Sequence, residues 1–396
     1  MAHRRFWSLR PATTREAVDA VWANLLLHWF PVRMRTSSLA WAPTFWLGTV
    51  TWILFLLLLI SGLPLMVFYI PSTGDAYRSV KDIEHVVSFG WWLRAVHRIG
   101  AHMMVVATTL HLVRVFVTGA YKNTEGRDQH REWNWVLGVA MLFATLLLSF
   151  TGYLLPWDQL AFWAVTVGTN IVSSAPVAGT VVREVLIGGR EIGQATLIRF
   201  YLLHIVVLPI AVAVLFGYHM WRIRKDGGLA NGDAADDDAG VVHAIPPIVL
   251  RIGVVSMATL LAVTLLATFI PSPLLDPANP LATPNPAKAP WYFLWLQEIV
   301  ADTTVRIGSF RVNGALIGGV LLPFALAVLL TVWPWVDRSP AEAVGVAFPR
   351  ARRIQIAVFL LMAFAITALT VIGLMRGPSW GLWWPWESWP DVPARF

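Results

Sequence analysis

Four histidines lie in two apolar segments at nearly the same spacing. His97 and His111 are 14 residues apart in one segment, and His204 and His219 are 15 apart in the other. With about 100° and 1.5 Å per residue of α-helix, each pair faces roughly one side, and its members lie about 21 to 22 Å apart. Imidazole is an axial ligand of haem iron, and two imidazoles on one iron leave no open position, which favours electron transfer over oxygen chemistry.

One further apolar segment separates the two histidine segments, so they cross a bilayer in the same direction. Equal depth then pairs His97 with His204 near the outer side and His111 with His219 near the cytoplasm. We therefore predict two noncovalent b-type haems stacked across the membrane. The alternative is four unrelated polar residues in a bundle core, but ionisable groups inside a bilayer are costly and usually functional.

Glycines repeat the same spacing on the neighbouring apolar segments. Gly48 and Gly62 are 14 residues apart, and so are Gly138 and Gly152. Glycine lets a flat group approach a helix closely. We expect Gly62 and Gly152 at the depth of the outer haem, and the other two at the depth of the inner haem.

Arginines accompany the histidines. Arg94 and Arg98 flank the first histidine, and Arg114 follows the second by three residues. Haem propionates are anionic and favour guanidinium partners, so we predict that these arginines contact the haems. The alternative is that they anchor helix ends. His102 has no matched partner, and we interpret it as structural.

The composition places the chain in a membrane. Of its 396 residues 57% are hydrophobic and 13% are charged, against roughly 25% charged in soluble domains. The chain has no cysteine, which excludes iron–sulfur ligation and a covalent c-type haem on this chain. The net charge of +7 lacks a basic cluster interleaved with aromatic residues, so no nucleic-acid partner is expected.

The pattern predicts an all-α membrane protein with seven spans, a four-helix dihaem bundle followed by three further helices. The expected spans are 44–70, 90–119, 133–155, 197–223, 247–270, 312–335 and 352–375. Five parts are expected: an amphipathic surface segment at 1–40, the dihaem domain at 41–225, a Gly/Asp-rich linker at 226–245, a C-terminal domain at 246–376 and a Trp-rich tail at 377–396.

The distribution of basic residues sets the expected orientation. Lysine and arginine are more numerous in the loops that share a side with the N-terminus, which places that side in the cytoplasm by the positive-inside rule. No removable signal peptide is expected, because the start of the chain lacks a short apolar core with a cleavage site. The expected location is the inner membrane of a prokaryotic cell.

Three motifs resemble the cytochrome b family of Rieske/cytochrome b complexes. They read SFGWWLRAVHRIGAHMMVVATTLHLVRVF, TGYLLPWDQLAFWAV and LIRFYLLHIVVLP. The 15-residue spacing and the PWDQ form are similar to the plastoquinol-oxidising branch. The second half, from IPPIVLRIG through DPANPLATP to PWYFLWLQE, resembles the three-helix subunit of that branch, here fused through the linker.

The resemblance implies a quinol:cytochrome c or similar oxidoreductase of a respiratory chain. Quinol would be oxidised at an outer site, with one electron passing to a Rieske iron–sulfur subunit and the other through two haems to an inner quinone site, coupled to proton translocation. The implied partners are that subunit, a c-type cytochrome or other acceptor, the lipid membrane and a second copy of the complex. The implied outer-site residues are Tyr153, Pro156, Trp157, Asp158, Pro290, Trp291 and Tyr292, and Arg224 would serve the inner site.

Two positions depart from the family pattern. The photosynthetic branch attaches an extra haem through a cysteine where this chain has Trp46. The family usually reads Pro-Glu-Trp-Tyr at the quinol site, where this chain reads Ala289-Pro290-Trp291-Tyr292 and so lacks the glutamate. Some base must replace that glutamate, since quinol oxidation releases protons. Glu298, two helical turns beyond Trp291, and Asp158 are the candidates. The alternative roles for Glu298 are an interface ion pair and a helix-end carboxylate.

Two other classes of protein are alternatives to the quinol oxidoreductase. One is a dihaem membrane anchor that delivers electrons from a dehydrogenase to quinone, although such anchors usually have four or five helices and neither the PWDQ nor the PWY motif. The other is a haem-free transporter with seven spans, which would lack a b-type absorption band after reduction.

Overall fold

The computed structural model describes residues 13–14, 33–42, 44–123, 128–226, 240–243, 246–340, 345–378 and 381–382. Most of the predicted surface segment, linker and Trp-rich tail lies outside these ranges, so their predicted boundaries stay predictions. Within the described residues, seven helical segments are long and apolar enough to cross a membrane. The predicted all-α membrane fold is confirmed.

Five of the seven spans are single helices: α2 (Leu47–Phe68), α4 (Gly90–Thr118), α5 (Arg131–Leu154), α10 (Pro247–Phe269) and α14 (Arg353–Leu374). The fourth span joins α8 (Gln194–Leu202), a π-helical turn η2 (Leu203–Val207) and α9 (Leu208–Lys225). The sixth joins α12 (Gly314–Leu316), a second π-helical turn η4 (Ile317–Leu321) and α13 (Leu322–Val336). Each span exceeds the roughly 20 residues that a bilayer requires.

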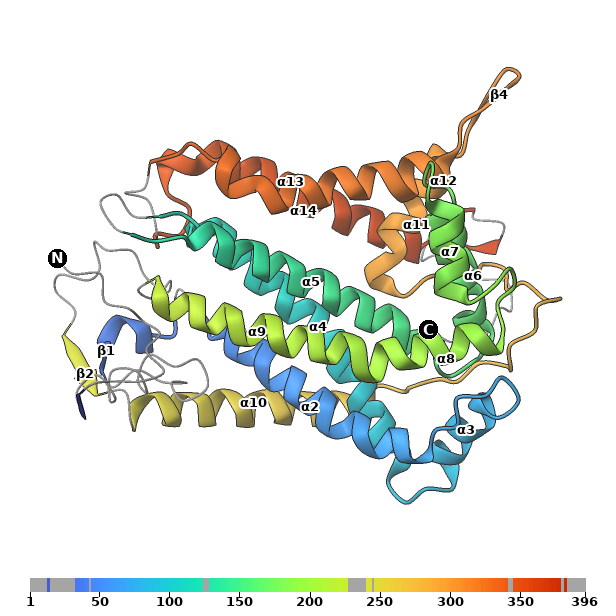
Figure 1. Ribbon diagram of the computed structural model, residues 1–396, viewed down its shortest axis with the longest axis horizontal. Helices are drawn as coiled ribbons and strands as arrows, with labels where there is room; N and C mark the ends of the chain where they lie inside the picture. Colours follow the sequence, from blue (N-terminus) through green and yellow to red (C-terminus); the bar gives the residue numbers. More distant parts are fainter. Residues whose placement is uncertain are drawn as a thin grey trace.

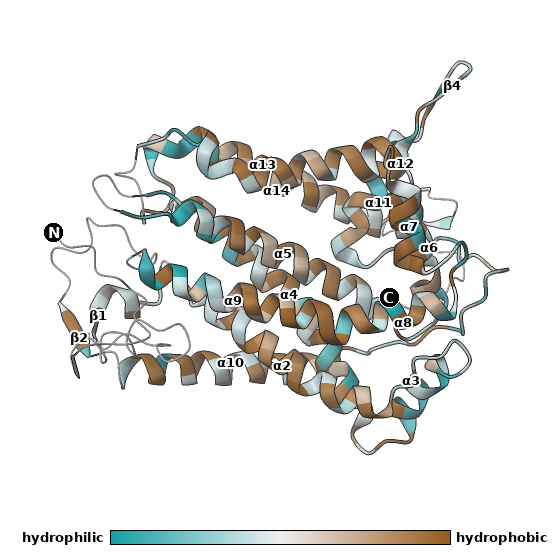
Figure 2. Cartoon of the chain, in the orientation of Figure 1, coloured by the Kyte–Doolittle hydropathy of each residue, from teal (hydrophilic) through white to brown (hydrophobic). Residues whose placement is uncertain are grey.

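The spans run side by side, and the last three do not form a bundle of their own (Figure 1). Helix α2 packs on α4, and α5 packs on α9. Helix α10 packs against α2 and α4 on one flank, whereas α13 packs against α5 on the other. The helices of the C-terminal half therefore pack against two opposite sides of the four-helix half. Apolar residues dominate along the spans, and hydrophilic ones gather toward their ends (Figure 2).

Shorter elements cap the two ends of the bundle. Helices α3 (Ala76–His85), α6 (Gln159–Ser173), α7 (Gly179–Ile187) and α11 (Trp291–Thr303) lie at one end, with a small hairpin of β3 (Arg306–Ile307) and β4 (Phe310–Arg311) (Figure 1). At the other end, β1 (Arg33–Arg35) pairs antiparallel with β2 (Val241–His243). Two 3₁₀ turns, η1 (Thr36–Leu39) and η6 (Arg350–Arg352), lie at that end too. The end of the predicted surface segment is thereby tied to the end of the predicted linker.

A buried ion pair fastens the sixth and seventh spans to the end of α4. Arg352 and Asp337 are both buried, with 3.3 Å between the Arg352 Nε and a carboxylate oxygen. The hydroxyl of Tyr121 donates to the same carboxylate at 2.7 Å and accepts from the indole N–H of Trp333 at 2.9 Å. Lys122 adds a second cation 3.5 Å from Asp337. Burial alone raises the pKa of Asp337, but hydrogen bonds from Ser339 and Tyr121 and the charge of Lys122 lower it to about 2.

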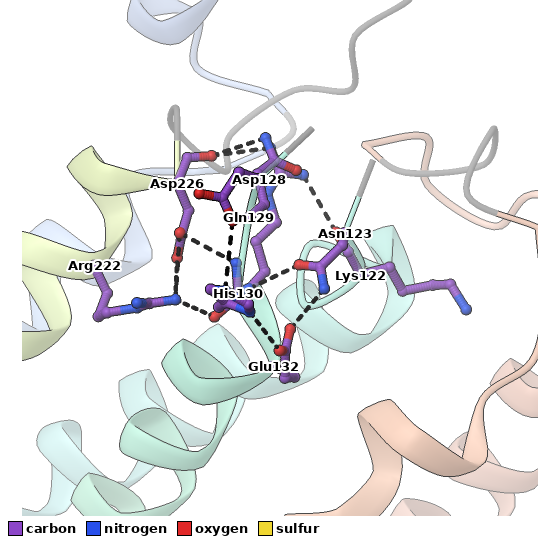
Figure 3. A network of polar contacts seen from close by, with 9 residues as sticks. Lys122, Asn123, Asp128, Gln129, His130, Glu132, Arg222 and Asp226 are labelled. Atoms are coloured by element: carbon purple, nitrogen blue, oxygen red, sulfur yellow. Dashed lines mark hydrogen bonds and ion pairs between the residues drawn. The ribbon is translucent and has the colours of Figure 1, made fainter. Parts of the chain in front are cut away.

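A second polar network joins the loop before α5 to the end of α9 (Figure 3). Arg222 pairs with Asp226 at 2.9 Å, and both are buried. The backbone N–H of His130 donates to Asp226 at 3.3 Å, and the Gln129 side chain donates to the Asp226 carbonyl at 3.0 Å. These contacts give partners to several buried polar groups where two spans leave the membrane.

We expect Asp337→Asn to lower the free energy of unfolding by about 3 to 5 kcal/mol, because it leaves the buried Arg352 cation uncompensated. Since the folded-state pKa is depressed from 3.8 to about 2, the Asp337 contribution is fully present above about pH 4 and is lost as the pH falls through 2. Thermal unfolding of the detergent-solubilised protein at pH 7 and pH 3 measures both effects. Asp82→Asn is the control, because Asp82 forms an exposed pair with Arg78 at 4.0 Å and such pairs contribute little. Equal losses in the two variants contradict this prediction.

Candidate functional site

The outer histidine pair is assembled from α4 and η2. The ring centroids of His97 and His204 lie 6.2 Å apart, with an angle of 73° between the rings. Two imidazoles on opposite sides of one metal ion, with bonds of about 2 Å each, place their centroids about 6 Å apart. The separation therefore fits a single iron between the two rings.

Hydrogen bonds orient both outer imidazoles. Nδ1 of His204 lies 3.1 Å from the carbonyl oxygen of Leu148, and 3.2 Å from Thr151 Oγ1. Nδ1 of His97 lies 2.9 Å from Ser61 Oγ and interacts with the backbone carbonyl of Leu58. A carbonyl acceptor at Nδ1 fixes the proton there, which leaves the lone pair of Nε2 for a metal.

The inner pair, His111 and His219, lines one cavity of about 1030 Å³. Nδ1 of His111 is buried and has no hydrogen-bond partner among the described residues. Nδ1 of His219 also has none at ordinary geometry, although the backbone carbonyl of Asn134 is close enough to interact. A cavity of this size lies at the upper end of the usual range for ligand sites.

Cations line this inner cavity. Arg35, Arg114, Arg131 and Arg224 contribute to its wall, which contains no aspartate or glutamate among the described residues. A cationic wall suits the propionates of a haem. Trp46, which stands where the photosynthetic branch has its cysteine, is buried in the same wall and donates its indole N–H to the Ala40 carbonyl at 3.2 Å.

Each predicted glycine faces the histidine at its own depth. A Cβ atom at Gly62 would lie 3.2 Å from the His97 ring, and one at Gly48 3.3 Å from the His111 ring. At Gly152 it would lie only 2.5 Å from the His204 ring, whereas at Gly138 the distance to His219 is 3.9 Å. Three of the four positions therefore leave no comfortable room for a side chain.

The unequal histidine spacings are reconciled by the π-helical turn η2. His204 lies within this turn, and a π-helical turn holds one residue more than an α-helical turn. The extra residue between His204 and His219 is absorbed there. The two histidines of the fourth span therefore keep nearly the same angular relation as His97 and His111, which lie in one continuous α-helix.

The two arginines that flank His97 on α4 have protein partners. Arg94 forms an ion pair with Glu84 at 2.7 Å and donates to the carbonyls of Ser272 and Pro273. Arg98 donates to the Pro271 carbonyl at 3.2 Å. Both arginines tie α4 to the loop that follows α10. These contacts match the alternative role, in which the arginines anchor the end of the helix. Their predicted contact with haem propionates stays a prediction.

The outer-site motifs meet at the end of the bundle that carries α6 and α11. Asp158 caps α6 by accepting from the backbone of Ala161 at 2.9 Å, and its other oxygen accepts from the backbone of Leu275 at 3.2 Å. Burial raises the pKa of Asp158, against the opposing effect of these hydrogen bonds. Tyr153 and Tyr292 are close enough to interact electrostatically with each other and with Arg98.

The remaining outer-site residues surround this group. Trp157 is buried, and its carbonyl accepts from the backbone of Ala278 at 3.1 Å. Pro156 lies in the turn between α5 and α6, and Pro290 immediately precedes Trp291 at the start of α11. Burial raises the pKa of Tyr292.

Glu298 is fully buried and forms an ion pair with Arg376. The Arg376 Nε lies 2.9 and 3.2 Å from its two oxygens. Asp302 lies 3.3 Å from the same guanidinium. The structure therefore has Glu298 in the ion pair that the sequence left open as an alternative.

Sequence reasoning missed one contact at this site. The indole N–H of Trp291 donates to Nδ1 of His102 at 3.1 Å. The Tyr292 ring lies beside the same imidazole, with 6.1 Å between centroids. The only signal in the sequence was a second histidine five residues after His97, and no local rule links that position to residue 291.

Much of the chain is similar in sequence to known proteins. Family models described as Cytochrome b(N-terminal)/b6/petB and Cytochrome b(C-terminal)/b6/petD match residues 102–277 and 277–383. Cytochrome b6 of Synechococcus elongatus is 39% identical over 210 residues, which covers 50% of this chain and 95% of that protein. Cytochrome b6 of Oltmannsiellopsis viridis is 40% identical over 211 residues, with the same coverage.

The chain belongs to the cytochrome b family. A solved structure titled "Hyperthermophilic respiratory Complex III" matches with a TM-score of 0.71 and 28% identity, and 84% of each chain is covered. The chain is thus a membrane cytochrome b subunit of a quinol oxidoreductase. The family binds b-type haem and interacts with quinone, so the transporter alternative falls away.

We expect Gly152→Ala to weaken binding of the outer haem, because the new methyl group overlaps the His204 ring. Loss of about half of the haem, with the inner haem retained, is the expected result. Gly217→Ala in α9 is the matched control, since a Cβ at that position meets no atom within 4 Å. Haem absorbance per protein measures both. Full haem content in Gly152→Ala would show that the ring does not need this glycine wall.

Proposed function

We propose that this cytochrome b holds two b-type haems and oxidises quinol at an outer site in a bifurcated reaction, with an inner quinone site near the cytoplasm. The observation that carries the proposal is that the outer histidines face each other, that the inner histidines line one cavity, and that a glycine lies against every imidazole. When bound, the haems supply a one-electron path across the bilayer.

The residues of the chain hold and orient this arrangement. The carbonyls of Leu58 and Leu148 aim the outer imidazoles, and Arg114 lies in the wall of the inner cavity, where a propionate would be bound. Carbonyl acceptors at Nδ1 favour a single tautomer, so that the iron-facing nitrogen keeps its lone pair.

The outer quinol site is proposed between residues 153–158 and residues 290–292. Tyr153, Tyr292 and Arg98 give it hydrogen-bonding groups. The 271–278 loop is held beside it by hydrogen bonds to Arg98 and to the Trp157 carbonyl. Asp158 is the proposed carboxylate near the leaving proton. Burial raises the pKa of Asp158 toward the working pH, which makes this carboxylate a better proton acceptor than a fully solvated one.

The inner quinone site is proposed in the same cavity as the inner histidine pair. Arg224 and His219 line it together with Arg35 from β1. Guanidinium groups can donate hydrogen bonds to a quinone carbonyl and stabilise the negative charge that develops there on reduction. The excess of lysine and arginine in the loops on the N-terminal side supports the proposal that this side is cytoplasmic, in a prokaryotic inner membrane.

The proposed partners are a Rieske iron–sulfur subunit and a c-type cytochrome or similar acceptor, in a dimeric complex that couples turnover to proton translocation. The absence of cysteine from this chain supports the assignment of the iron–sulfur cluster to another subunit.

We expect two haems per chain in the purified protein, measured as pyridine haemochrome against protein concentration. His204→Leu and His219→Leu should each lose one haem, because each removes one of the two proposed axial ligands of that haem and puts a bulky aliphatic side chain in its place. His130→Leu, in a loop at the end of the bundle, should keep both. One haem per chain in the wild type contradicts the dihaem proposal.

The role of Glu298 is tested through its partner. We expect Glu298→Gln and Arg376→Gln to destabilise the protein similarly, by about 3 kcal/mol, since each breaks the same buried pair. Both should retain quinol oxidation per folded complex. Asp302→Asn, which removes only the exposed second carboxylate, should have a small effect. A tenfold loss of turnover in Glu298→Gln alone would restore it as the proton acceptor.

A further inference from the structure

His102 lies at the proposed outer quinol site without a role in it. It projects from α4 five residues after His97, and its imidazole contacts the two aromatic residues that begin α11. The indole N–H of Trp291 donates to its Nδ1 at 3.1 Å. No hydrogen-bond partner of its Nε2 is found among the described residues.

The two carboxylates near the site are already engaged by the protein. Each oxygen of Asp158 accepts a backbone N–H, and Glu298 is held by Arg376. A quinol head group needs at least one fixed polar contact to be oriented in an otherwise apolar pocket. Of these three residues, His102 alone combines a position against Trp291 and Tyr292 with a nitrogen that no protein group occupies.

The hydrogen bond from Trp291 determines which nitrogen of His102 carries the proton. Indole N–H is a donor only, so Nδ1 must present its lone pair. The neutral ring therefore carries its proton on Nε2. A second proton would place two N–H groups against each other at Nδ1. His102 is thus held neutral, with one N–H to donate.

We propose that His102 binds the quinol head group by donating from Nε2–H to a hydroxyl or carbonyl oxygen of the substrate. Trp291 is the positioning residue that fixes this tautomer. The proposal rests on the proposed quinol site between α4, α5 and α11. It assigns recognition to a residue on the haem-binding helix, and it leaves proton acceptance to another group.

The test is steady-state oxidation of a short-chain quinol by the whole membrane complex. We expect His102→Leu to raise KM by about tenfold, the loss of one hydrogen bond, with a smaller change in kcat. His102→Gln keeps an N–H donor at similar reach and should stay within about threefold of wild type. Trp291→Phe should raise KM about threefold. The double variant should be no worse than His102→Leu, because Trp291 acts through His102.

Two controls separate the possible failures. His85→Leu changes an exposed histidine on α3, at the same end of the bundle, and should leave KM unchanged. Haem content should be normal in every variant. An unchanged KM in His102→Leu, or an equal rise in the Gln and Leu variants, overturns the assignment while leaving the proposed function intact. A wild-type complex that does not oxidise quinol contradicts the proposed function and this assignment with it.

Discussion

A flat imidazole ring needs a wall of bare backbone, and this steric constraint sets the spacing of the four central helices. Gly62 and Gly48 on α2 face the two histidines of α4, while Gly152 on α5 faces the outer histidine of the fourth span. Helices that approach so closely must present small residues at the contact. The pairings of α2 with α4 and of α5 with α9 follow from that requirement, and the C-terminal spans pack on the outside of the result.

Charge is kept to the ends of the bundle, where it joins one part of the chain to another. Arg352 pairs with Asp337 where the last two spans meet and donates to carbonyls at the end of α4. Arg222 pairs with Asp226 at the end of α9, and both bond to the backbone of His130 in the loop before α5. Glu298 joins α11 to the end of α14 through Arg376. Buried pairs gain little over apolar packing but are costly to break. They therefore enforce which helix ends meet more than they add to overall stability.

The periodic features were predictable because helix geometry is local. The spacing of His97 and His111 and the matching glycines follow from rise and rotation per residue, and the apolar spans follow from bilayer thickness. Contacts between distant segments were not predictable in this way. Glu298 meets Arg376 78 residues later, Arg94 meets a loop nearly 180 residues away, and Trp291 meets His102 across 189 residues. Such partners are chosen by the packing of whole helices, which one sequence does not specify.

The π-helical turn at Leu203–Val207 makes the fourth span tolerant of a change in length at one place. A residue added to an ordinary helix rotates everything beyond it by about 100° and would turn one histidine out of the bundle. A residue removed within this turn returns it to α-helical geometry, and both histidines keep their faces. Homologues with 14 or 15 residues between these ligands can therefore share one bundle, and the point of insertion between them is this single turn.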